Sequence, residues 1–440
     1  MLYKLNSFKF YSLQMVQNKI QLFFLLLMGA VFQATAQDYA PLPYPDRVIL
    51  TWTANPSNSQ TVTWRTDTTV TAAKAQIKAE DSSPALETEI ASYDAETRPL
   101  RGGAYLTANY HHLTFQNLKP NTVYAYRVGA GESWSEWFQF TTASEKAAPF
   151  SFIYLGDAQN DIRSKWSRVI RKAFSHQPDA RFIIHTGDLI NRSNNDKEWG
   201  EWHYGGGFIN GMIPSLPSPG NHEYFRDEKK VLTLDPHWGA QYTLPDNGPE
   251  GLKESVYYID YQGMRVISLD SQMIILDESS AKVQYEWLEK VLQENRNLWT
   301  VITFHHPIFS TAKSRDNKEF RERFKPLFDR YHVDLVLQGH DHTYSRGQNL
   351  PRGLSGREAG GPVYLVSVAG PKMYKVDGAK WMNVSLENTQ LFQIIRVNGQ
   401  DLKFEAYKTS GELFDAFSLK KKSRAEAAVF TELNPEAIKR

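Results

Sequence analysis

Short apolar runs that stop at a polar, glycine-containing loop recur through the middle and second half of the chain. Runs of this length that are rich in β-branched residues and leucine predict buried strands followed by loops. Between them, residues 162–174 and 283–292 place apolar positions at helical spacing, and residues 318–331 are predicted to be helical with a kink or break at Pro326. Strands and helices in alternation predict a layered α/β domain. The predicted strands cover residues 150–155, 181–184, 299–304 and 333–338, with a hairpin over 256–259 and 265–269.

The first part of the chain has a different pattern, in which short strands are separated by polar turns. Residues 47–142 contain about seven such segments, a spacing that predicts a β-sandwich. The stretch Leu118–Val128, where a Pro-Asn-Thr turn precedes a tyrosine-rich strand, resembles the corner of a fibronectin type III domain. His111 and His112 lie inside this sandwich, and we expect both to be structural.

After the last helix the pattern returns to strands, over residues 363–368, 391–397, 402–407 and 413–419. Residues 420–440 begin with three lysines and are expected to be a solvated tail. The predicted fold class is therefore α+β with two domains. We expect a β-sandwich over residues 40–145, a layered α/β domain over 148–420 and a tail over 421–440.

The N-terminal 36 residues have the pattern of a secretory signal peptide. From Met15 a basic segment leads into an apolar run over residues 22–32 and then into Ala34-Thr-Ala36, a small-residue cleavage site. We therefore expect residues 1–36 to be a signal peptide, with Met15 as the start, and the protein to be secreted or periplasmic. The apolar run is too short to cross a bilayer comfortably, so no transmembrane segment is expected in the mature chain.

Charge and composition narrow the kinds of partner and site. The formal net charge of +1 gives no electrostatic reason to expect binding to nucleic acid or to an anionic membrane. The chain of 440 residues contains no cysteine, which excludes disulfides, thiolate metal ligands and a cysteine nucleophile. Any metal site must therefore use oxygen and imidazole ligands, which suits iron, manganese or zinc. Nothing in the sequence indicates the oligomeric state.

Residues able to bind metals follow most of the predicted strands of the α/β domain. In open α/β sheets, ligands bind outside the carboxyl ends of the strands, so these loops are expected to converge on one edge. Two aspartates, an asparagine and three histidines are enough for a site with two metal ions if one carboxylate bridges them. The candidate ligands are Asp157, Asp188, Asn221, His305, His340 and His342.

The motifs around these residues, taken together, resemble those of the calcineurin-like metallophosphoesterases. They are Gly156-Asp157, Gly187-Asp188, Gly220-Asn-His-Glu223, His305 and Gly339-His-Asp-His342. The surrounding stretches Tyr110–Thr122, Glu198–Trp202 and His340–Arg346 resemble the purple acid phosphatase-like branch of that family.

This resemblance implies an enzyme that hydrolyses small phosphate monoesters, by attack of a hydroxide bound to two metal ions of iron, zinc or manganese. One ion would be held by Asp157, Asp188 and His342. The second would be held by Asp188, Asn221, His305 and His340, with Asp188 shared. His222 is the candidate for protonating the leaving group, and Glu223 is expected to orient it.

The chain also departs from the family pattern. Purple acid phosphatases carry a tyrosine three residues after the bridging aspartate, and its charge transfer to iron gives the colour. Asn191 occupies that position here, so no purple colour is expected. Either Gln159 or Asn191 completes the first metal site, and Lys313 or Arg315 is a candidate for binding phosphate if this loop is not simply solvated.

Other histidines receive weaker interpretations. His306 is expected to point away from the metals, His185 to be a core or supporting residue, and His203 to line the substrate entrance. The ligand set does not separate phosphate monoesters from diesters, so a phosphodiesterase or nucleotidase remains an alternative. A hydrolase of other esters and a non-catalytic binding protein built on the sandwich are further alternatives. The binding protein requires six matching positions to be incidental.

Overall fold

The structure is a computed structural model that describes residues 39–101, 107–348, 361–377 and 381–439. Residues 41–440 form one compact unit. The predicted signal peptide lies outside the described residues. Among the residues that are described, no helix has both the length and the apolar character needed to cross a membrane.

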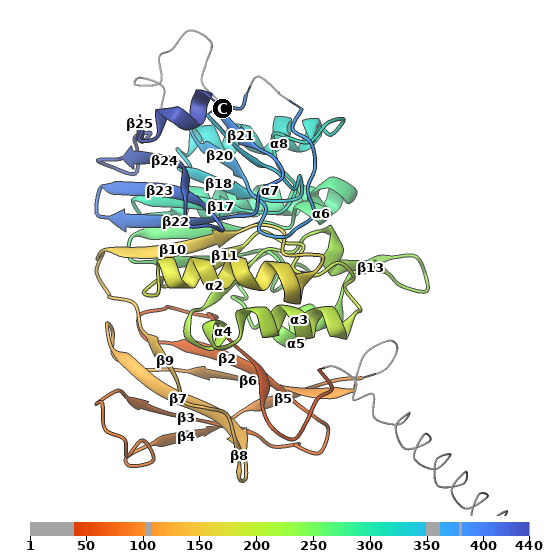
Figure 1. Cartoon of the computed structure of the whole chain (residues 1–440), viewed down its shortest axis with the longest axis vertical. Coiled ribbons are helices and arrows are strands. Elements are labelled where there is room, and N and C mark those ends of the chain that lie inside the picture. The colour runs from red at the N-terminus through yellow and green to blue at the C-terminus, as the bar shows by residue number, and fades with distance from the viewer. Residues whose placement is uncertain (1–38, 102–106, 349–360, 378–380, 440) are drawn as a thin grey trace, which may run out of the picture. The chain divides into compact units, whose positions relative to one another are not determined.

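The first part of the compact unit is a β-sandwich, which confirms that part of the predicted fold class (Figure 1). One sheet has the strand order β1-β2-β6-β5, and the other has β4-β3-β7-β8 with β9 also paired to β7. Val62, Trp64 and Tyr126 lie in the core between them. The strands are β1 (Asp46–Thr51), β2 (Gln60–Thr66), β3 (Lys74–Ala79), β4 (Ala91–Asp94), β5 (Glu96–Leu100), β6 (Ala108–Phe115), β7 (Val123–Ala130), β8 (Ser133–Trp134) and β9 (Phe138–Thr141).

Strand β2 is buried on both faces because its outer face packs against the α/β domain. Arg65 on this strand and Arg47 on β1 both bind Asp196, with nitrogen–oxygen distances of 3.2 and 2.8 Å. All three side chains are almost completely buried. A buried carboxylate is tolerated only when it is paired, so this contact joins the sandwich firmly to the helix that begins at Asp196.

The α/β domain is built on two larger sheets. The first has the order β12-β11-β10-β22-β23-β24-β25, in which β10, β11 and β12 are parallel. The second has the order β15-β16-β17-β18-β20-β19-β21, in which β16, β17, β18 and β20 are parallel. The first sheet comprises β10 (Phe150–Leu155), β11 (Ile183–His185), β12 (Ser215–Pro217), β22 (Leu391–Asn398), β23 (Asp401–Lys408), β24 (Leu413–Lys420) and β25 (Val429–Glu432). The second comprises β15 (Tyr257–Tyr261), β16 (Met264–Ser268), β17 (Trp299–Thr303), β18 (Leu335–Gln338), β19 (Tyr344–Gln348), β20 (Val363–Val366) and β21 (Val384–Leu386).

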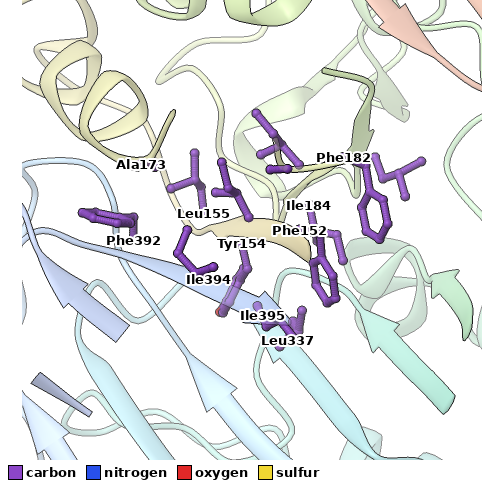
Figure 2. Close-up of a cluster of buried hydrophobic side chains, with 14 of the residues drawn as sticks. Phe152, Tyr154, Leu155, Ala173, Phe182, Ile184, Leu337, Phe392, Ile394 and Ile395 are labelled. Carbon is purple, nitrogen blue, oxygen red and sulfur yellow. The ribbon is translucent and has the colours of Figure 1, made fainter. Parts of the chain in front are cut away.

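The main core lies between these two sheets and under helix α2 (Ser167–His176), which covers the first sheet. Figure 2 shows Phe152 and Tyr154 of β10 close to Leu337 of the second sheet, while Leu155 lies toward Ala173 and Phe392. Strand geometry explains this division, because successive side chains of β10 point to opposite faces. The Tyr154 hydroxyl also donates a hydrogen bond to the Gln338 carbonyl at the end of β18, which ties the two sheets together near their carboxyl ends.

Helices cover the sheets on their outer faces. Trp166, Val169 and Ile170 are buried as predicted, although the first turn is a π-helix. A second core lies under α7 and α8. The helical elements are η1 (Ile162–Trp166), α2 (Ser167–His176), α3 (Asp196–Gly206), α4 (Phe208–Met212), η2 (Asn221–Glu223), α5 (Pro236–Gln241), α6 (Ser271–Leu276), α7 (Glu278–Glu294), α8 (Lys318–Arg330) and η3 (Pro435–Lys439). A hairpin of β13 (Tyr224–Arg226) and β14 (Leu232–Leu234) follows η2 (Figure 1).

The α8 helix continues through Pro326, so of the predicted kink or break the break does not occur. Pro326 is exposed, so the carbonyl that it leaves unbonded faces water, while Phe324 and Phe328 hold the other side of the helix in the core.

Residues 421–440 are also not a solvated tail within the part that is described. Strand β25 pairs antiparallel with β24 and extends the first sheet. Lys421 is buried and pairs with Asp334 at 2.8 Å, and Glu432 accepts a hydrogen bond from Arg346 at 2.7 Å.

Candidate metal centre

The candidate ligands lie just beyond the carboxyl ends of neighbouring parallel strands. Asp157 follows β10, Asp188 follows β11 and Asn221 follows β12, all in the first sheet. His305 follows β17, and His340 and His342 follow β18, both in the second sheet. Because the two sheets pack face to face, side chains that are far apart in the sequence meet at one edge of the domain.

Two carboxylates and one histidine form the first group. Asp157, Asp188 and His342 are buried, and each offers a ligand atom within 4.8 Å of the others. His342 donates from Nδ1 to the Lys372 carbonyl at 2.9 Å, which leaves Nε2 as the acceptor that faces Asp157 at 3.6 Å. Both oxygens of Asp157 accept from the His340 amide.

Histidines dominate the second group. His305 donates from Nδ1 to the Thr186 carbonyl at 2.8 Å, so its Nε2 faces the site. That nitrogen lies 3.0 Å from Nδ1 of His340, 3.1 Å from Oδ1 of Asn221 and 3.1 Å from Oδ2 of Asp188. Asp188 therefore reaches both groups, since it lies beside His305 as well as Asp157.

His306 is placed differently from expectation. Its ring centre lies 4.2 Å from that of His340, and its ligand nitrogen lies within 4.8 Å of those of His305 and His340. The chain leaves the β17 strand at Thr303, so strand alternation no longer sets the direction of the His306 side chain. Nδ1 of His306 is 3.0 Å from the Ser271 hydroxyl, which fixes the ring beside the second group.

The charges in the cluster favour a proton on His305. Burial opposes the imidazolium form of His305, but the carboxylates of Asp188 and Asp157 outweigh it and raise its pKa to about 9. Burial alone would raise the pKa of Asp188, yet contact with His305 holds that pKa well below its usual range. Burial raises the pKa of Asp157, with a further contribution from Asp188.

Three of the candidate ligands have a strained backbone conformation. Asp188, His340 and His342 have φ values of 51°, 72° and 48°, a left-handed conformation that costs free energy in a residue with a side chain. Gly187 also has a positive φ of 84°, and a Cβ atom there would lie 2.6 Å from the Gly220 nitrogen. The loops are thus held in a sparsely populated conformation that brings the ligand side chains together.

Glu223 supports these loops instead of orienting His222, which corrects the expectation from the sequence. Its carboxylate is completely buried and accepts backbone hydrogen bonds from Gly220 at 2.7 Å, Asp188 at 2.9 Å and Leu189 at 2.7 Å. Burial, together with the negative charge of Asp188, raises the pKa of Glu223 to about 7.

His222 is oriented by a backbone carbonyl. Its Nδ1 donates to the Asn191 carbonyl at 2.6 Å, and its amide donates to Oδ1 of Asp188 at 3.0 Å. Nε2 then faces Oδ2 of Asp188 at 3.9 Å, in a side chain that is 26% exposed. The imidazole is therefore beside the candidate metal ligands and open to a small molecule.

Gln159, and not the Asn191 side chain, contacts the first group. The Gln159 Nε2 atom lies 2.8 Å from Oδ2 of Asp188 and 3.1 Å from Nε2 of His342. Its Oε1 atom is buried without a hydrogen-bond partner among the described residues. The backbone of Asn191 is engaged with His222 and with Glu198 at 2.6 Å.

Of the two basic candidates, Arg315 is beside the site. It donates from Nη1 to the His340 carbonyl and to Asp341, both at 3.0 Å. Lys313 is exposed. Sequence reasoning missed Lys372 and Tyr374, whose only signal was their position shortly after the β20 strand; the Tyr374 ring centre lies 4.8 Å from that of His342.

Four other histidines that the sequence singled out are buried and structural. His111 and His112 are buried in the sandwich, as predicted, and bond to Thr66 and Thr63. His185 is buried against Trp202, at 5.4 Å between ring centres, which fits a core role. His203 does not line an entrance, because it is buried and bonded to Gln241 at 2.8 Å.

The donor set fits two metal ions. Nε2 of His305 lies 3.1 Å from both Oδ1 of Asn221 and Oδ2 of Asp188, so these three ligand atoms surround one small volume. Loss of the proton from His305 would leave all three as acceptors. A cation placed among them would satisfy all of them. Carboxylate, amide and imidazole donors without thiolates match zinc, iron and manganese.

Comparison with known families gives two matches along the chain. Residues 45–142 match the purple acid phosphatase N-terminal domain, and residues 150–344 match the calcineurin-like phosphoesterase family. A purple acid phosphatase of Glycine max is 27% identical over 289 residues, which are 59% of this chain and 60% of that protein. The Fe(3+)-Zn(2+) purple acid phosphatase 12 of Arabidopsis thaliana is 25% identical over 267 residues, or 56% of this chain and 54% of that protein. The chain thus matches a little over half the length of these curated relatives.

A solved structure shows the same fold. The purple acid phosphatase from yellow lupin (Lupinus luteus) seeds superposes with a TM-score of 0.70 at 19% identity, covering 86% of this chain and 74% of that one. The two family matches follow the same order along the chain as the sandwich and the layered sheets of the structure. In the two domains that these family models match, the chain resembles the purple acid phosphatase-like branch of the calcineurin-like metallophosphoesterases.

Proposed function

We propose that the protein is a phosphatase that hydrolyses phosphate monoesters at a centre of two metal ions. The observation that supports this most is the convergence of six candidate ligands from five strand ends, with Asp188 placed between two groups of donors. The family relationship supports the same class of reaction.

The first ion would be held by Asp157, Asp188 and His342, and Gln159 is the best-placed residue to complete its surroundings. A side-chain flip would turn the unpaired oxygen of Gln159 toward the site, since amide oxygen and nitrogen have nearly the same shape. The second ion would be held by Asp188, Asn221, His305 and His340. When bound, the two ions would supply Lewis-acid activation of the phosphate and of the attacking water.

His222 is proposed to give a proton to the leaving oxygen. The Asn191 carbonyl holds its Nδ1, so Nε2 is the nitrogen that exchanges protons with a bound molecule. The contacts of Glu223 keep the loop that carries His222 in place without touching its imidazole. Chemistry of this kind needs no protein nucleophile.

We propose that the metal pair gives no visible colour, unlike that of a purple acid phosphatase. One relative is named for Fe(3+) and Zn(2+). The tyrosine expected to produce colour is replaced here by Asn191, whose backbone contacts His222 and Glu198. An iron-loaded sample should therefore show no visible charge-transfer band, and a band that persists in the pure protein would contradict this assignment.

The first experiment measures metal content and p-nitrophenyl phosphate hydrolysis in the wild type, in Asp188→Asn and in Asp401→Asn. Asp401 is an exposed aspartate on β23, far along the chain from every candidate ligand, so Asp401→Asn is the matched control. We expect about two metals per chain with activity in the wild type and the control, and loss of both in Asp188→Asn.

The alternatives predict other results. Faster hydrolysis of bis-(p-nitrophenyl) phosphate than of the monoester would replace the proposal with a phosphodiesterase. Bound metal without activity on either compound would indicate a different ester. A protein with neither metal nor activity would be a binding protein built on the sandwich.

The role of His222 has a separate test. Protonation matters most when the leaving oxygen is basic, so His222→Asn should reduce kcat for glycerol 3-phosphate by about 100-fold or more. The same variant should reduce kcat for p-nitrophenyl phosphate far less, because p-nitrophenolate leaves without a proton. Equal losses on the two substrates would contradict proton donation and indicate a positioning role.

Export is proposed on the pattern of residues 15–36, with its basic segment, apolar run and small-residue site. N-terminal sequencing of the protein from the periplasmic and medium fractions tests this. A mature chain that starts at Gln37 supports cleavage, and an intact N-terminus in the cell interior contradicts it.

A further inference from the structure

The segment after β20 lies directly on the loops that carry the candidate metal ligands. Gly370 donates its amide to the Asp157 carbonyl at 2.6 Å. The Lys372 carbonyl accepts from Nδ1 of His342 at 2.9 Å, and the Tyr374 amide donates to the His342 carbonyl at 3.2 Å. Residues 370–374 are thus fixed to both a carboxylate ligand and an imidazole ligand, so their side chains belong to the surroundings of the site.

Two cations gather around one aromatic ring in this segment. Tyr374 packs on His342, with 4.8 Å between ring centres. The Arg315 guanidinium carbon lies 4.9 Å from the Tyr374 ring centre, and Nζ of Lys372 lies 5.6 Å from it. Attraction to the ring face positions both positive charges beside His342 without neutralising either of them.

The two cations differ in what else they bind. Arg315 is occupied by the His340 carbonyl and by Asp341. Lys372 is half-buried, and among the described residues its ammonium has no carboxylate partner. Lys375, three residues further along, shows the usual arrangement: it is exposed and pairs with Glu387 at 2.7 Å. A half-buried ammonium without an anionic partner can bind an anionic group of a ligand.

We propose that Lys372 determines substrate specificity by binding a second anionic group on the substrate, a carboxylate or another phosphate, while the scissile phosphate occupies the metal centre. This inference rests on the proposed phosphatase function. The substrate class that it selects is phosphate esters with a further negative charge a few bonds from the scissile phosphate. Tyr374 is a positioning residue, because its ring contacts both His342 and the Lys372 ammonium.

The test compares pairs of inhibitors that differ in one charge. The pairs are 3-phosphonopropionate with propylphosphonate, and 4-phosphonobutyrate with butylphosphonate, each measured as an inhibitor of p-nitrophenyl phosphate hydrolysis by the metal-loaded protein. Within a pair the phosphonate is the same, so the ratio of inhibition constants reports only the added carboxylate. Two chain lengths are used so that spacing alone does not decide the result.

The variants are Lys372→Met, Lys372→Arg and the control Lys375→Met. Hydrogen bonds to charged groups and partly exposed ion pairs imply that the wild type prefers at least one carboxylate inhibitor by about 3- to 10-fold. Lys372→Met should bring that ratio close to one, Lys372→Arg should largely keep it, and Lys375→Met should leave it unchanged.

A wild-type ratio near one for both pairs, or a preference that survives in Lys372→Met, would overturn the proposal. A ratio lost equally in Lys375→Met would also overturn it, because general surface charge would then explain the preference. If the wild type hydrolyses no phosphate ester, the proposed function fails. The same four compounds are then compared by isothermal titration calorimetry on the metal-loaded protein, where equal affinities within each pair would overturn the assignment of Lys372 as well.

Discussion

Replacing Glu223 by glutamine tests whether a buried carboxylate holds the metal-ligand loops in their strained conformation. Glutamine has nearly the same size, but only one of its two terminal atoms accepts hydrogen bonds. With its oxygen in the place of Oε2, the side chain keeps the bonds from Asp188 and Gly220. Its amino group then faces the Leu189 amide, where the wild type has a bond of 2.7 Å.

The expected loss of stability follows from these contacts. At a pH above the Glu223 pKa of about 7, one hydrogen bond to a charged group is removed, at a cost of roughly 1.5–3 kcal/mol, and the buried Leu189 amide is left without a partner. Relief of the repulsion between Glu223 and Asp188 offsets part of this cost. We therefore expect Glu223→Gln to lower the free energy of unfolding of the metal-free protein by about 2 kcal/mol.

Glu223→Gln should also weaken metal binding. Asp188 has a φ of 51°, and its amide is bonded to the Glu223 carboxylate. Weakening that bond lets the loop relax and moves the carboxylate away from the position between the two groups of donors. Changes to residues that support metal ligands typically reduce affinity by about 10- to 100-fold, which is our expectation here.

Two measurements check this prediction: urea unfolding of the metal-free proteins, and zinc competition with a chelating dye. Glu228→Gln, at an exposed position in the β13–β14 hairpin, is the control. Wild-type zinc affinity in Glu223→Gln would refute the reasoning, even if stability falls, because the carboxylate would then support the fold but not the ligand geometry.

Three further predictions concern the junction, the core and the metals. Asp196→Asn leaves Arg47 buried without a counter-charge, while Arg65 keeps Asp46, and should destabilise the protein at pH 7 by about 3 kcal/mol in urea unfolding. Contacts with His237 and the two arginines outweigh burial and hold the pKa of Asp196 below its usual range, so its contribution is complete above the unfolded pKa of about 3.9 and declines as the pH falls further; a difference between the two proteins that is the same at pH 3 as at pH 7 would contradict this. Phe152→Ala opens a cavity in the core and should cost about 3–5 kcal/mol, whereas Tyr93→Ala, at a 48% exposed position, should cost little, and equal losses would be inconsistent with the packing described. Dialysis against a chelator should abolish phosphatase activity, and zinc, iron or manganese should restore it, while activity that persists in protein shown to be free of metal would exclude a metal-dependent reaction.

The strand-end positions of the candidate ligands could be predicted from the sequence because they depend on local signals. An apolar run ended by glycine identifies both the strand and the loop after it, as at Gly156 and Gly339. The parallel arrangement of the strands then brings those loops to one edge. The two-domain fold followed in the same way, from the change in pattern near residue 147.

What the sequence did not reveal depends on contacts between distant segments. The direction of His306 depends on the chain path beyond β17 and on Ser271, and Glu223 binds backbone amides of a loop that follows another strand. The C-terminal strand β25 was missed for a similar reason: the lysines at 420–422 predict a tail, and the strand forms only by pairing with the edge of β24. Lys372 became a candidate only when the structure placed its segment against His342.

The division of the candidate ligands between two sheets has a consequence for how the centre responds to distant changes. Asp157, Asp188 and Asn221 extend from the first sheet, whereas the histidine ligands extend from the second, so neither sheet carries a complete site. Metal affinity therefore depends on how closely the two sheets pack. By thermodynamic linkage, bound metal in turn favours the closely packed arrangement. A substitution between the sheets, remote from the centre, would change metal occupancy without touching a ligand. The metal concentration around the protein would in turn affect how closely the two sheets pack.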